Sequence, residues 1–402
     1  MREAVAGVPV PSPLVVAIGA AAEPGEIGYD DLPAEGSRIV SPRDPESLAV
    51  LLYTSGTSGK PRAAMLSHRA LLANIEQSAG TTPAPVRQGD IVLGVLPMFH
   101  VYGLNAVLGQ VLLTGASLVI GDRFDADETL ALIQREQVTC VPVAPPVITS
   151  WLGHRDVATA LSSVRMLLSG AAPLSEETVR AFEELTGIVV EQGYGLTEAG
   201  PVVTSTIGAP THKPGSAGRA LPGVELRVVD EAGTDVHPAD PGEIWVRGQN
   251  LFSGYWPDGD AAPGPDGWLR TGDIGFLDAD GDLFMVDRLR ELVIVSGFNV
   301  YPSEIEDVVG EVEGVRECAV IGVAHAATGE AVVAYVVPAD LPAHLDAAGL
   351  EAAVLAHCED RLARFKMPSR VEIVDELPHS ATGKVAKGRL RANQSRHEMG
   401  LS

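Results

Sequence analysis

The stretch from Tyr53 to His68, "YTSGTSGKPRAAMLSH", combines the residue types that bind phosphate. Its glycines let backbone N–H groups approach an anion closely, its hydroxyl side chains add donors, and its lysine adds a full positive charge. The candidate phosphate-binding residues are Thr54, Ser55, Gly56, Thr57, Ser58, Gly59 and Lys60. A solvated turn rich in Ser, Thr and Gly is the alternative interpretation when the stretch is taken alone.

This stretch differs from the P-loop pattern GxxxxGK[ST] at two positions. Thr54 stands five residues before Gly59, where the pattern has Gly, and Pro61 follows Lys60, where it has Ser or Thr. A P-loop needs a helix that starts there and a hydroxyl group for magnesium. Since Pro61 fits only a loop or the first turn of a helix, we expect phosphate to be bound by a different plan.

Lysine is scarce in this chain, and its placement is informative. Of the 29 basic residues, only five are lysines. Two of them, Lys60 and Lys384, lie in segments rich in Gly, Ser and Thr. A lysine in such a setting indicates that a compact ammonium is required rather than the planar fork of arginine.

The elements that must position these residues alternate along the chain. Each expected strand is apolar on both faces and is separated from the next by a helical pattern, which predicts a largely parallel α/β core. We expect strands at 91–96, 117–121, 139–145, 165–170 and 188–195, and helices at 104–113, 125–137 and 175–187.

The pattern changes after about residue 208. Short strands with frequent Gly, Pro and Asp turns predict an antiparallel β subdomain at about 210–287. A smaller α+β unit then begins, with strands at 291–297, 316–323 and 331–337, a helix from Ser303 and a helix at 347–363. We therefore expect a large α/β domain over 1–287, which includes the β subdomain, and a small, mobile α+β C-terminal domain over 288–402.

Composition limits the partners and the location. A formal net charge of -24 would repel nucleic acid and anionic lipid, so neither is expected as a bulk partner. Residues 91–121 carry no Asp, Glu, Lys or Arg, but Pro, His, Asn and Gln interrupt them. We expect a buried strand, loop and helix there rather than a membrane span, and peripheral membrane contact and a homo-oligomer stay open. The three scattered cysteines and the proline-broken N-terminus favour a cytoplasmic protein without a signal peptide.

Six motifs in order resemble the signatures of the adenylate-forming superfamily, which includes acyl-CoA synthetases. They are "YTSGTSGKPRAAMLSH", "YGLTEAG", "GEIWVRG", "WLRTGD", "DRLRELVIVSGFNVYPSEIE" and "HSATGKVAKGRLR", and they extend from about 48 to 391. In this family a carboxylate attacks the α-phosphate of ATP to give acyl-AMP and pyrophosphate. A thiol, usually that of coenzyme A, then displaces AMP.

The resemblance implies roles for residues on the nucleotide. Tyr194 would stack on adenine, Thr197 would bond a phosphate oxygen and Glu198 would hold Mg²⁺. Asp273 would accept both ribose hydroxyls, and Arg288 would reach the ribose or the α-phosphate. Backbone beside the purine would come from Gly170, Ala171, Ala172, Pro173 and Gly195. Each side chain taken alone also fits a core aromatic, a solvated acid or a plain turn.

The resemblance also implies two conformations of the small domain. A hinge near Asp287–Glu291, centred on Arg290, would bring Lys384 to the carboxylate and the α-phosphate in one orientation. In the other orientation the residues beside the thiol tunnel would be Ser296, Gly297 and Phe298. "PMFHVYG" would line the acyl pocket through His100 and Gly103.

The absence of acidic residues at 91–121 favours an uncharged acyl chain. We expect a fatty acid–CoA ligase that uses ATP, Mg²⁺ and coenzyme A. An aryl- or other carboxylate–CoA ligase and a truncated, non-catalytic nucleotide-binding protein are the alternatives. Only 52 residues precede Tyr53, whereas the resemblance implies a longer N-terminal segment. We therefore expect a shortened form or a start that has been assigned too late.

Overall fold

The computed structural model describes residues 15–17, 26–32, 42–54, 62–121, 124–172, 174–288, 291–295, 298–325, 328–339, 346–379 and 385–398. Its contacts divide the chain into two units, Met1–Asp44 and Pro45–Ser402. In the first unit, strand β1 (Val15–Ala17) pairs in parallel with β2 (Glu26–Gly28), which the short 3-10 helix η1 (Tyr29–Asp31) follows. The predicted domain boundary at 287/288 stays a prediction.

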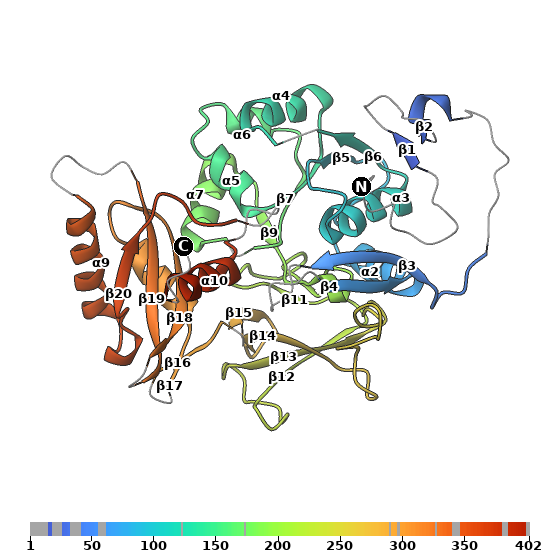
Figure 1. Ribbon diagram of the computed structural model, residues 1–402. Helices are drawn as coiled ribbons and strands as arrows, with labels where there is room; N and C mark the ends of the chain where they lie inside the picture. The colour runs from blue at the N-terminus through green and yellow to red at the C-terminus, as the bar shows by residue number, and fades with distance from the viewer. Residues whose placement is uncertain are drawn as a thin grey trace. The chain divides into compact units, whose positions relative to one another are not determined.

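A five-stranded parallel sheet lies in the second unit, with strand order β6-β5-β7-β8-β9 (Figure 1). The strands are β5 (Ile91–Gly94), β6 (Ser117–Ile120), β7 (Cys140–Val143), β8 (Met166–Ser169) and β9 (Val190–Gln192). The helices around it are α2 (His68–Ala79), η2 (Tyr102–Gly109), α3 (Gln110–Thr114), α4 (Ala126–Glu136), α5 (Pro145–Trp151), α6 (Val157–Ala160) and α7 (Glu176–Thr186). The predicted parallel α/β core is confirmed.

Both faces of this sheet are covered by apolar side chains. Helices α4 to α7 pack on one face, where Trp151 and Phe182 are fully buried. Helices η2 and α3 pack on the opposite face through Val107 and Val111. All four residues of β7 are buried, as expected for a strand between two helical layers. Because helices cover both faces, residues that bind a ligand must lie in the segments that follow the strand ends.

Local signals explain where the helices begin and end. Ser175 caps α7 by accepting a hydrogen bond from the Thr178 N–H, and Gly187 ends it with a φ of 70°. The helix predicted at 104–113 starts earlier, as the π-helix η2, continues as α3 and ends at Gly115, which also has a φ of 70°. Within the described ranges, no helix is long and apolar enough to cross a membrane.

A buried ion pair ties together the amino ends of three parallel strands. The Asp90 carboxylate, before β5, accepts hydrogen bonds from the Arg165 guanidinium (2.5 Å) and the Thr139 hydroxyl (2.9 Å). Arg165 precedes β8 and Thr139 precedes β7. Burial acts to raise the pKa of Asp90, but hydrogen bonds from Arg165, the Arg87 amide and Thr139 outweigh it and lower that pKa.

A hairpin and a second, antiparallel sheet lie beside the parallel sheet. Strand β3 (Leu48–Thr54) pairs with β4 (Arg62–Ser67), and the order of the four-stranded sheet is β12-β13-β14-β15. Its strands are β12 (Val224–Val229), β13 (Gly242–Gly248), β14 (Leu269–Leu277) and β15 (Leu283–Arg288). One apolar core joins the hairpin, the segment around Tyr194 and this sheet. The predicted antiparallel β region is confirmed.

The C-terminal region is α+β, as predicted. Its sheet has the order β17-β16-β19-β18, and β20 adds in parallel to β19. Helices α8 and α9 pack on one face and α10 on the other. The elements are β16 (Val293–Val295), β17 (Phe298–Val300), α8 (Pro302–Gly310), β18 (Val315–His325), β19 (Gly329–Pro338), α9 (Ala347–Arg361), η4 (Arg364–Lys366), β20 (Arg370–Ile373) and α10 (Lys387–Glu398).

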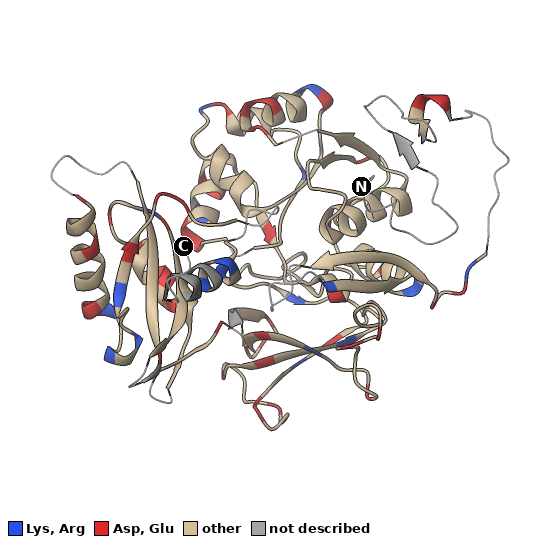
Figure 2. Cartoon of the chain, in the orientation of Figure 1, with Lys and Arg blue, Asp and Glu red and all other residues tan. Residues whose placement is uncertain are grey.

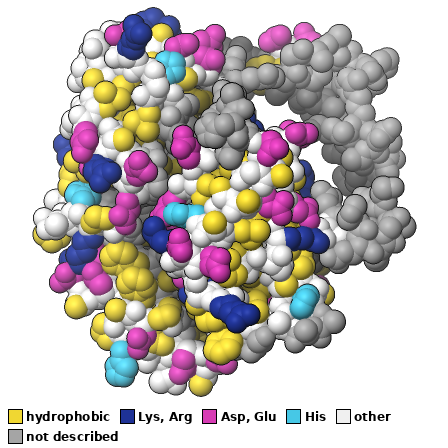
Figure 3. All heavy atoms as spheres, turned by 90° about the vertical axis from the view of Figure 1, so that its left-hand side faces the viewer, with side chains coloured by type: hydrophobic (Ala, Val, Ile, Leu, Met, Phe, Trp, Pro, Cys, Tyr) yellow, Lys and Arg dark blue, Asp and Glu magenta, His cyan; other side chains and the backbone are white. Residues whose placement is uncertain are grey.

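Charged side chains of both signs are interspersed along the elements in Figure 2, and on the face in Figure 3 they alternate with apolar ones. The edge strand β6 and the helix α3 both expose large apolar side chains. Leu112 is 73% exposed and Ile120 is 68% exposed.

Candidate active site

Tyr194 and Asp273 come together although they are 79 positions apart. Tyr194 follows the carboxyl end of β9, Asp273 lies in β14, and the Tyr194 hydroxyl donates to Asp273 Oδ2 over 2.7 Å. Neither residue is more than 9% exposed. The backbone of Tyr194 is held by the Thr204 hydroxyl (3.1 Å), and that of Asp273 by the Thr271 hydroxyl (3.1 Å). The residues predicted to contact adenine and ribose are therefore neighbours.

The turn after Tyr194 is tight and depends on glycine. A Cβ atom at Gly195 would lie 2.2 Å from the Pro201 carbonyl oxygen, a distance that no side chain tolerates. The Leu196 N–H also donates to that oxygen, over 3.0 Å. The 3-10 helix η3 (Thr197–Ala199) follows this turn directly, and its first two residues are the predicted phosphate-binding threonine and metal-binding Glu198.

Glu198 is held on both its backbone and its side chain. Its carbonyl oxygen accepts from the Phe252 N–H over 2.9 Å, and its carboxylate accepts from the Tyr255 hydroxyl. Burial, and then the nearby Glu198 charge, raise the pKa of Tyr255 well above its ordinary value. Tyr255 is therefore a protonated donor at neutral pH.

The chemistry of this donor set fits Mg²⁺. Magnesium is usually bound by one or two carboxylates together with substrate phosphate oxygens and water, not by a cage of protein ligands. Glu198 presents such a carboxylate, whose Oε1 accepts from the Tyr255 hydroxyl.

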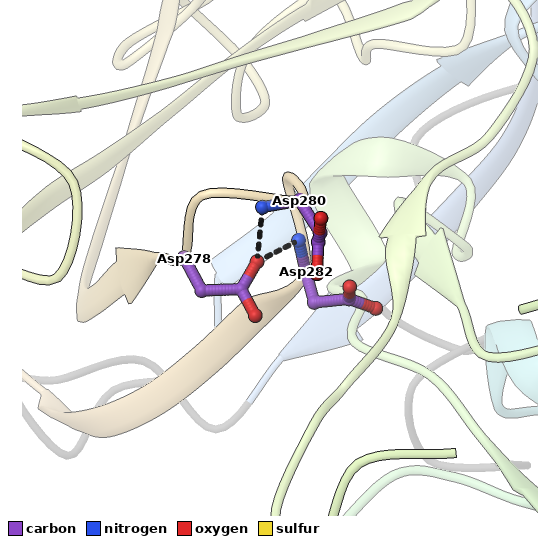
Figure 4. Close-up of side chains that lie close together, drawn as sticks. All are labelled: Asp278, Asp280 and Asp282. Carbon is purple, nitrogen blue, oxygen red and sulfur yellow. Dashed lines mark hydrogen bonds between the residues drawn. The ribbon is translucent and has the colours of Figure 1, made fainter. Parts of the chain in front are cut away.

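Three aspartates form a separate acidic cluster, and in the part of the chain that the structure describes it is the only close group of three possible metal ligands. Asp278, Asp280 and Asp282 lie on the turn between β14 and β15 (Figure 4). Lys213 Nζ lies 2.5, 2.7 and 3.0 Å from their carboxylates. The Lys213 ammonium therefore occupies the place that a metal cation would take. Its ion pairs join the 213–219 segment to the turn between β14 and β15.

The segments that follow the carboxyl ends of β5 and β8 contain a second group of the predicted site residues. A Cβ atom at Gly170 would lie 3.0 Å from the Tyr102 ring, so glycine lets the ring pack against the backbone. The next residue, Ala171, has a φ of 74°, which is rare for a residue with a side chain. His100 Nδ1 accepts from the Tyr102 N–H over 3.2 Å. Ligands of open α/β sheets bind at this edge.

The remaining predicted residues divide into described and undescribed ones. Thr54 ends β3, and its hydroxyl donates to the Arg62 carbonyl oxygen over 3.4 Å. A Cβ atom at Gly103 would lie 2.4 Å from the Pro97 carbonyl oxygen. Phe298 stacks on Phe365, with ring centroids 4.7 Å apart. Ala172 follows Ala171 and is described. Ser55, Gly56, Thr57, Ser58, Gly59, Lys60, Pro173, Arg290, Ser296, Gly297, Lys384 and the side chain of Arg288 lie outside the described residues.

Sequence reasoning missed Tyr255, Tyr102 and Arg62, whose guanidinium lies 3.7 Å from the centroid of the Tyr255 ring. Tyr255 lies 57 positions after Glu198 and contacts it only through the tertiary fold. Its signal, an aromatic residue directly after Gly254 between two strands, is a weak one. Tyr102 lies inside the quoted motif "PMFHVYG", but its partner Gly170 is far away in the sequence.

Residues 4–256 match the family described as AMP-binding enzyme, and residues 304–384 match the AMP-binding enzyme C-terminal domain. The chain is 38% identical over 352 residues to a long-chain-fatty-acid–CoA ligase of Bacillus subtilis, covering 86% of this chain and 62% of that protein. It is 40% identical over 376 residues to an indoleacetate–CoA ligase of Aromatoleum aromaticum, covering 91% of this chain and 72% of that protein. The chain thus spans only part of the length of these relatives.

Solved structures agree with the sequence comparisons. The crystal structure of ATP-bound MatB from Rhodopseudomonas palustris superposes with a TM-score of 0.81 at 37% identity. The match covers 90% of this chain and 70% of that one. The likeness therefore extends over both the N-terminal and the C-terminal parts of the described fold.

Proposed function

This chain belongs to the AMP-binding enzyme family, in the acyl-CoA synthetase branch of the adenylate-forming superfamily, and from this premise we propose that it is an ATP-dependent acid–CoA ligase. The carboxylate oxygen of the acid attacks the α-phosphorus of ATP, and the bond to the pyrophosphate leaving group breaks. The CoA thiol then loses its proton, attacks the acyl carbon and displaces AMP. The observation that carries the proposal is the buried Tyr194–Asp273 pair beside η3.

The roles proposed for the described residues follow from their places. The Tyr194 ring supports adenine, and the Asp273 carboxylate accepts from the ribose hydroxyls. The Thr197 hydroxyl donates to a phosphate oxygen, and Glu198 holds Mg²⁺, which would neutralise charge on the phosphates. The backbone of Gly170, Ala171 and Ala172 borders the purine, at the carboxyl edge of the sheet where such ligands bind.

The roles proposed for the undescribed residues rest on their motifs alone. Residues 55–60 hold the β- and γ-phosphates, and Arg288 reaches the ribose or the α-phosphate. Lys384 stabilises the charge that develops between the carboxylate and the α-phosphate. Ser296 to Phe298 border the thiol tunnel after the small domain, 288–402, has rotated.

A fatty acid is the substrate that we propose first. The 91–121 segment has no charged residue, and the Bacillus subtilis relative is named for long-chain fatty acids. An aryl acid is the second candidate, because the Tyr102 ring packs against Gly170 after the carboxyl end of β8 and another relative is named for indoleacetate. The scattered cysteines favour a cytoplasmic location.

Two assays test these proposals. ATP–pyrophosphate exchange with octanoate, palmitate, indoleacetate and coumarate should show activity with the true substrate class. Lys384→Ala should abolish adenylate formation but leave thioester formation from supplied acyl-AMP. Equal loss of both half-reactions would contradict the role of Lys384, and wild-type protein that binds ATP but forms no acyl-AMP with any acid would indicate a non-catalytic nucleotide-binding protein.

A further inference from the structure

Tyr255 lies on a segment that is fastened to two parts of the proposed site. On one side, the Ser253 N–H donates to the Met65 carbonyl oxygen (2.9 Å) and the Trp256 N–H donates to that of Ala63 (2.9 Å), which pairs the segment with β4. On the other side, the Phe252 N–H donates to the Glu198 carbonyl oxygen. The segment therefore connects the hairpin β3–β4 to η3, which carries the proposed metal ligand Glu198.

The Tyr255 ring is fixed by its neighbours. The Arg62 guanidinium lies over it, 3.7 Å from the ring centroid, and Arg62 is itself held by Asp260 through an ion pair of 2.5 Å. The edge of Phe252 packs at a centroid distance of 5.2 Å. A cation over one aromatic face and an aromatic contact together restrict the rotamer of Tyr255, which limits where its hydroxyl can lie.

The hydroxyl lies beside Glu198. It donates to Oε1, which restrains rotation of the carboxylate. Arg62, the first residue of β4, is paired in register with Thr54, the last residue of β3.

We propose that Tyr255 is a positioning residue: it orients the Glu198 carboxylate for the Mg²⁺ ion that accompanies ATP, and Arg62 holds its ring in place. This inference rests on the proposed function. In this role Tyr255 acts through Glu198.

Tyr255→Phe tests the proposal, because it removes the hydroxyl and keeps the ring beneath Arg62. Titration calorimetry with ATP, in Mg²⁺ and in EDTA, separates the magnesium-dependent gain in affinity from the rest of binding. We expect this gain to fall about 10-fold, the equivalent of one hydrogen bond to a charged acceptor, while affinity in EDTA changes less than about twofold. Tyr335→Phe is the matched control, since it removes a buried hydroxyl that donates to Gln394 over 2.7 Å in the C-terminal region. It should leave both affinities unchanged.

A double-mutant cycle shows whether Tyr255 acts through Glu198. If it does, Tyr255→Phe should cause no further loss of the magnesium-dependent gain in a Glu198→Gln background. The melting temperature in EDTA establishes that each variant is folded. If Tyr255→Phe does not fold, Arg62→Lys serves instead, because it keeps the charge and loses the stack, and a smaller loss of the same gain is expected.

The outcomes separate this inference from the proposed function. Wild-type protein that binds ATP no better with Mg²⁺ than with EDTA would overturn both. Wild-type protein that shows the gain, together with a folded Tyr255→Phe variant that retains it in full, would overturn the inference alone.

Discussion

Although Tyr194→Phe and Asp273→Asn change the same hydrogen bond, the first should mainly lower stability and the second should mainly weaken ATP binding. Tyr194→Phe removes the donor and keeps the aromatic face proposed for adenine. Asp273→Asn removes the charge proposed for the ribose, while its amide oxygen still accepts from the Tyr194 hydroxyl. Tyr194→Phe therefore tests how much the hydrogen bond stabilises the protein, and Asp273→Asn tests whether the carboxylate binds the ribose of ATP.

The magnitudes follow from burial and charge. A hydrogen bond to a charged acceptor contributes about 1.5–3 kcal/mol, and neither Tyr194 nor Asp273 is more than 9% exposed, so solvent screening is weak. Tyr194→Phe should lower the free energy of unfolding of the nucleotide-free protein by about 2 kcal/mol, seen as a fall in melting temperature of about 3 °C. Its dissociation constant for ATP should rise less than about threefold, because the ring remains. Asp273→Asn should lower stability by less than about 1 kcal/mol and weaken ATP about 10- to 100-fold.

Thermal melting without nucleotide and titration calorimetry with ATP give the two quantities. An analogue without ribose hydroxyls, 2′,3′-dideoxy-ATP, adds a control, since Asp273→Asn should not weaken its binding. If the two variants weaken ATP equally, or if Asp273→Asn weakens the dideoxy analogue as much as ATP, the roles assigned to Tyr194 and Asp273 are wrong.

Gly195→Ala should yield no soluble protein, because its Cβ would lie 2.2 Å from a carbonyl oxygen, whereas Gly153→Ala, with nothing within 4 Å of its Cβ, should melt within about 1 °C of wild type. Since the pKa of Asp90 is lowered in the folded state, its contribution to the free energy of unfolding is present above the ordinary carboxyl value of about 4 and is lost as pH falls through the folded pKa. Arg165→Met should therefore be less stable than wild type at pH 7 in urea titrations, and the difference should shrink in acid; a constant difference would contradict this reasoning. Lys213→Met should lower the melting temperature at low ionic strength, because three carboxylates would then face one another, and added salt should recover part of the loss, whereas Lys213→Arg should stay near wild type.

Much of the fold could be predicted because its signals are local. Ser175 and Gly187 mark the two ends of α7, and each lies directly beside the helix end that it marks. Runs such as "CVPV" in β7 are apolar on both faces, and only a sheet between two helical layers buries such a run. Strand β4 was missed, because the residues after Pro61 were treated as part of a phosphate loop and not as the return strand of a hairpin.

The site could be predicted only in part, for a physical reason. Motifs identify Tyr194, Glu198 and Asp273 one by one, but no spacing says that the tyrosine hydroxyl turns to the aspartate. Contacts of that kind depend on how β14 packs against the segment after β9. The acidic cluster around Lys213 is similar, since its three aspartates are close in sequence while the lysine comes from a distant turn.

The exposed apolar side chains of α3 and β6 have a consequence for handling the protein. A formal net charge of -24 makes copies of the chain repel one another at low ionic strength. Leu112, Leu113 and Ile120 attract one another across copies at any ionic strength. Added salt screens the repulsion and leaves the attraction, so light scattering from a dilute solution should rise as sodium chloride is added. In this chain, we therefore expect salt concentration to set the balance between dispersed molecules and clusters.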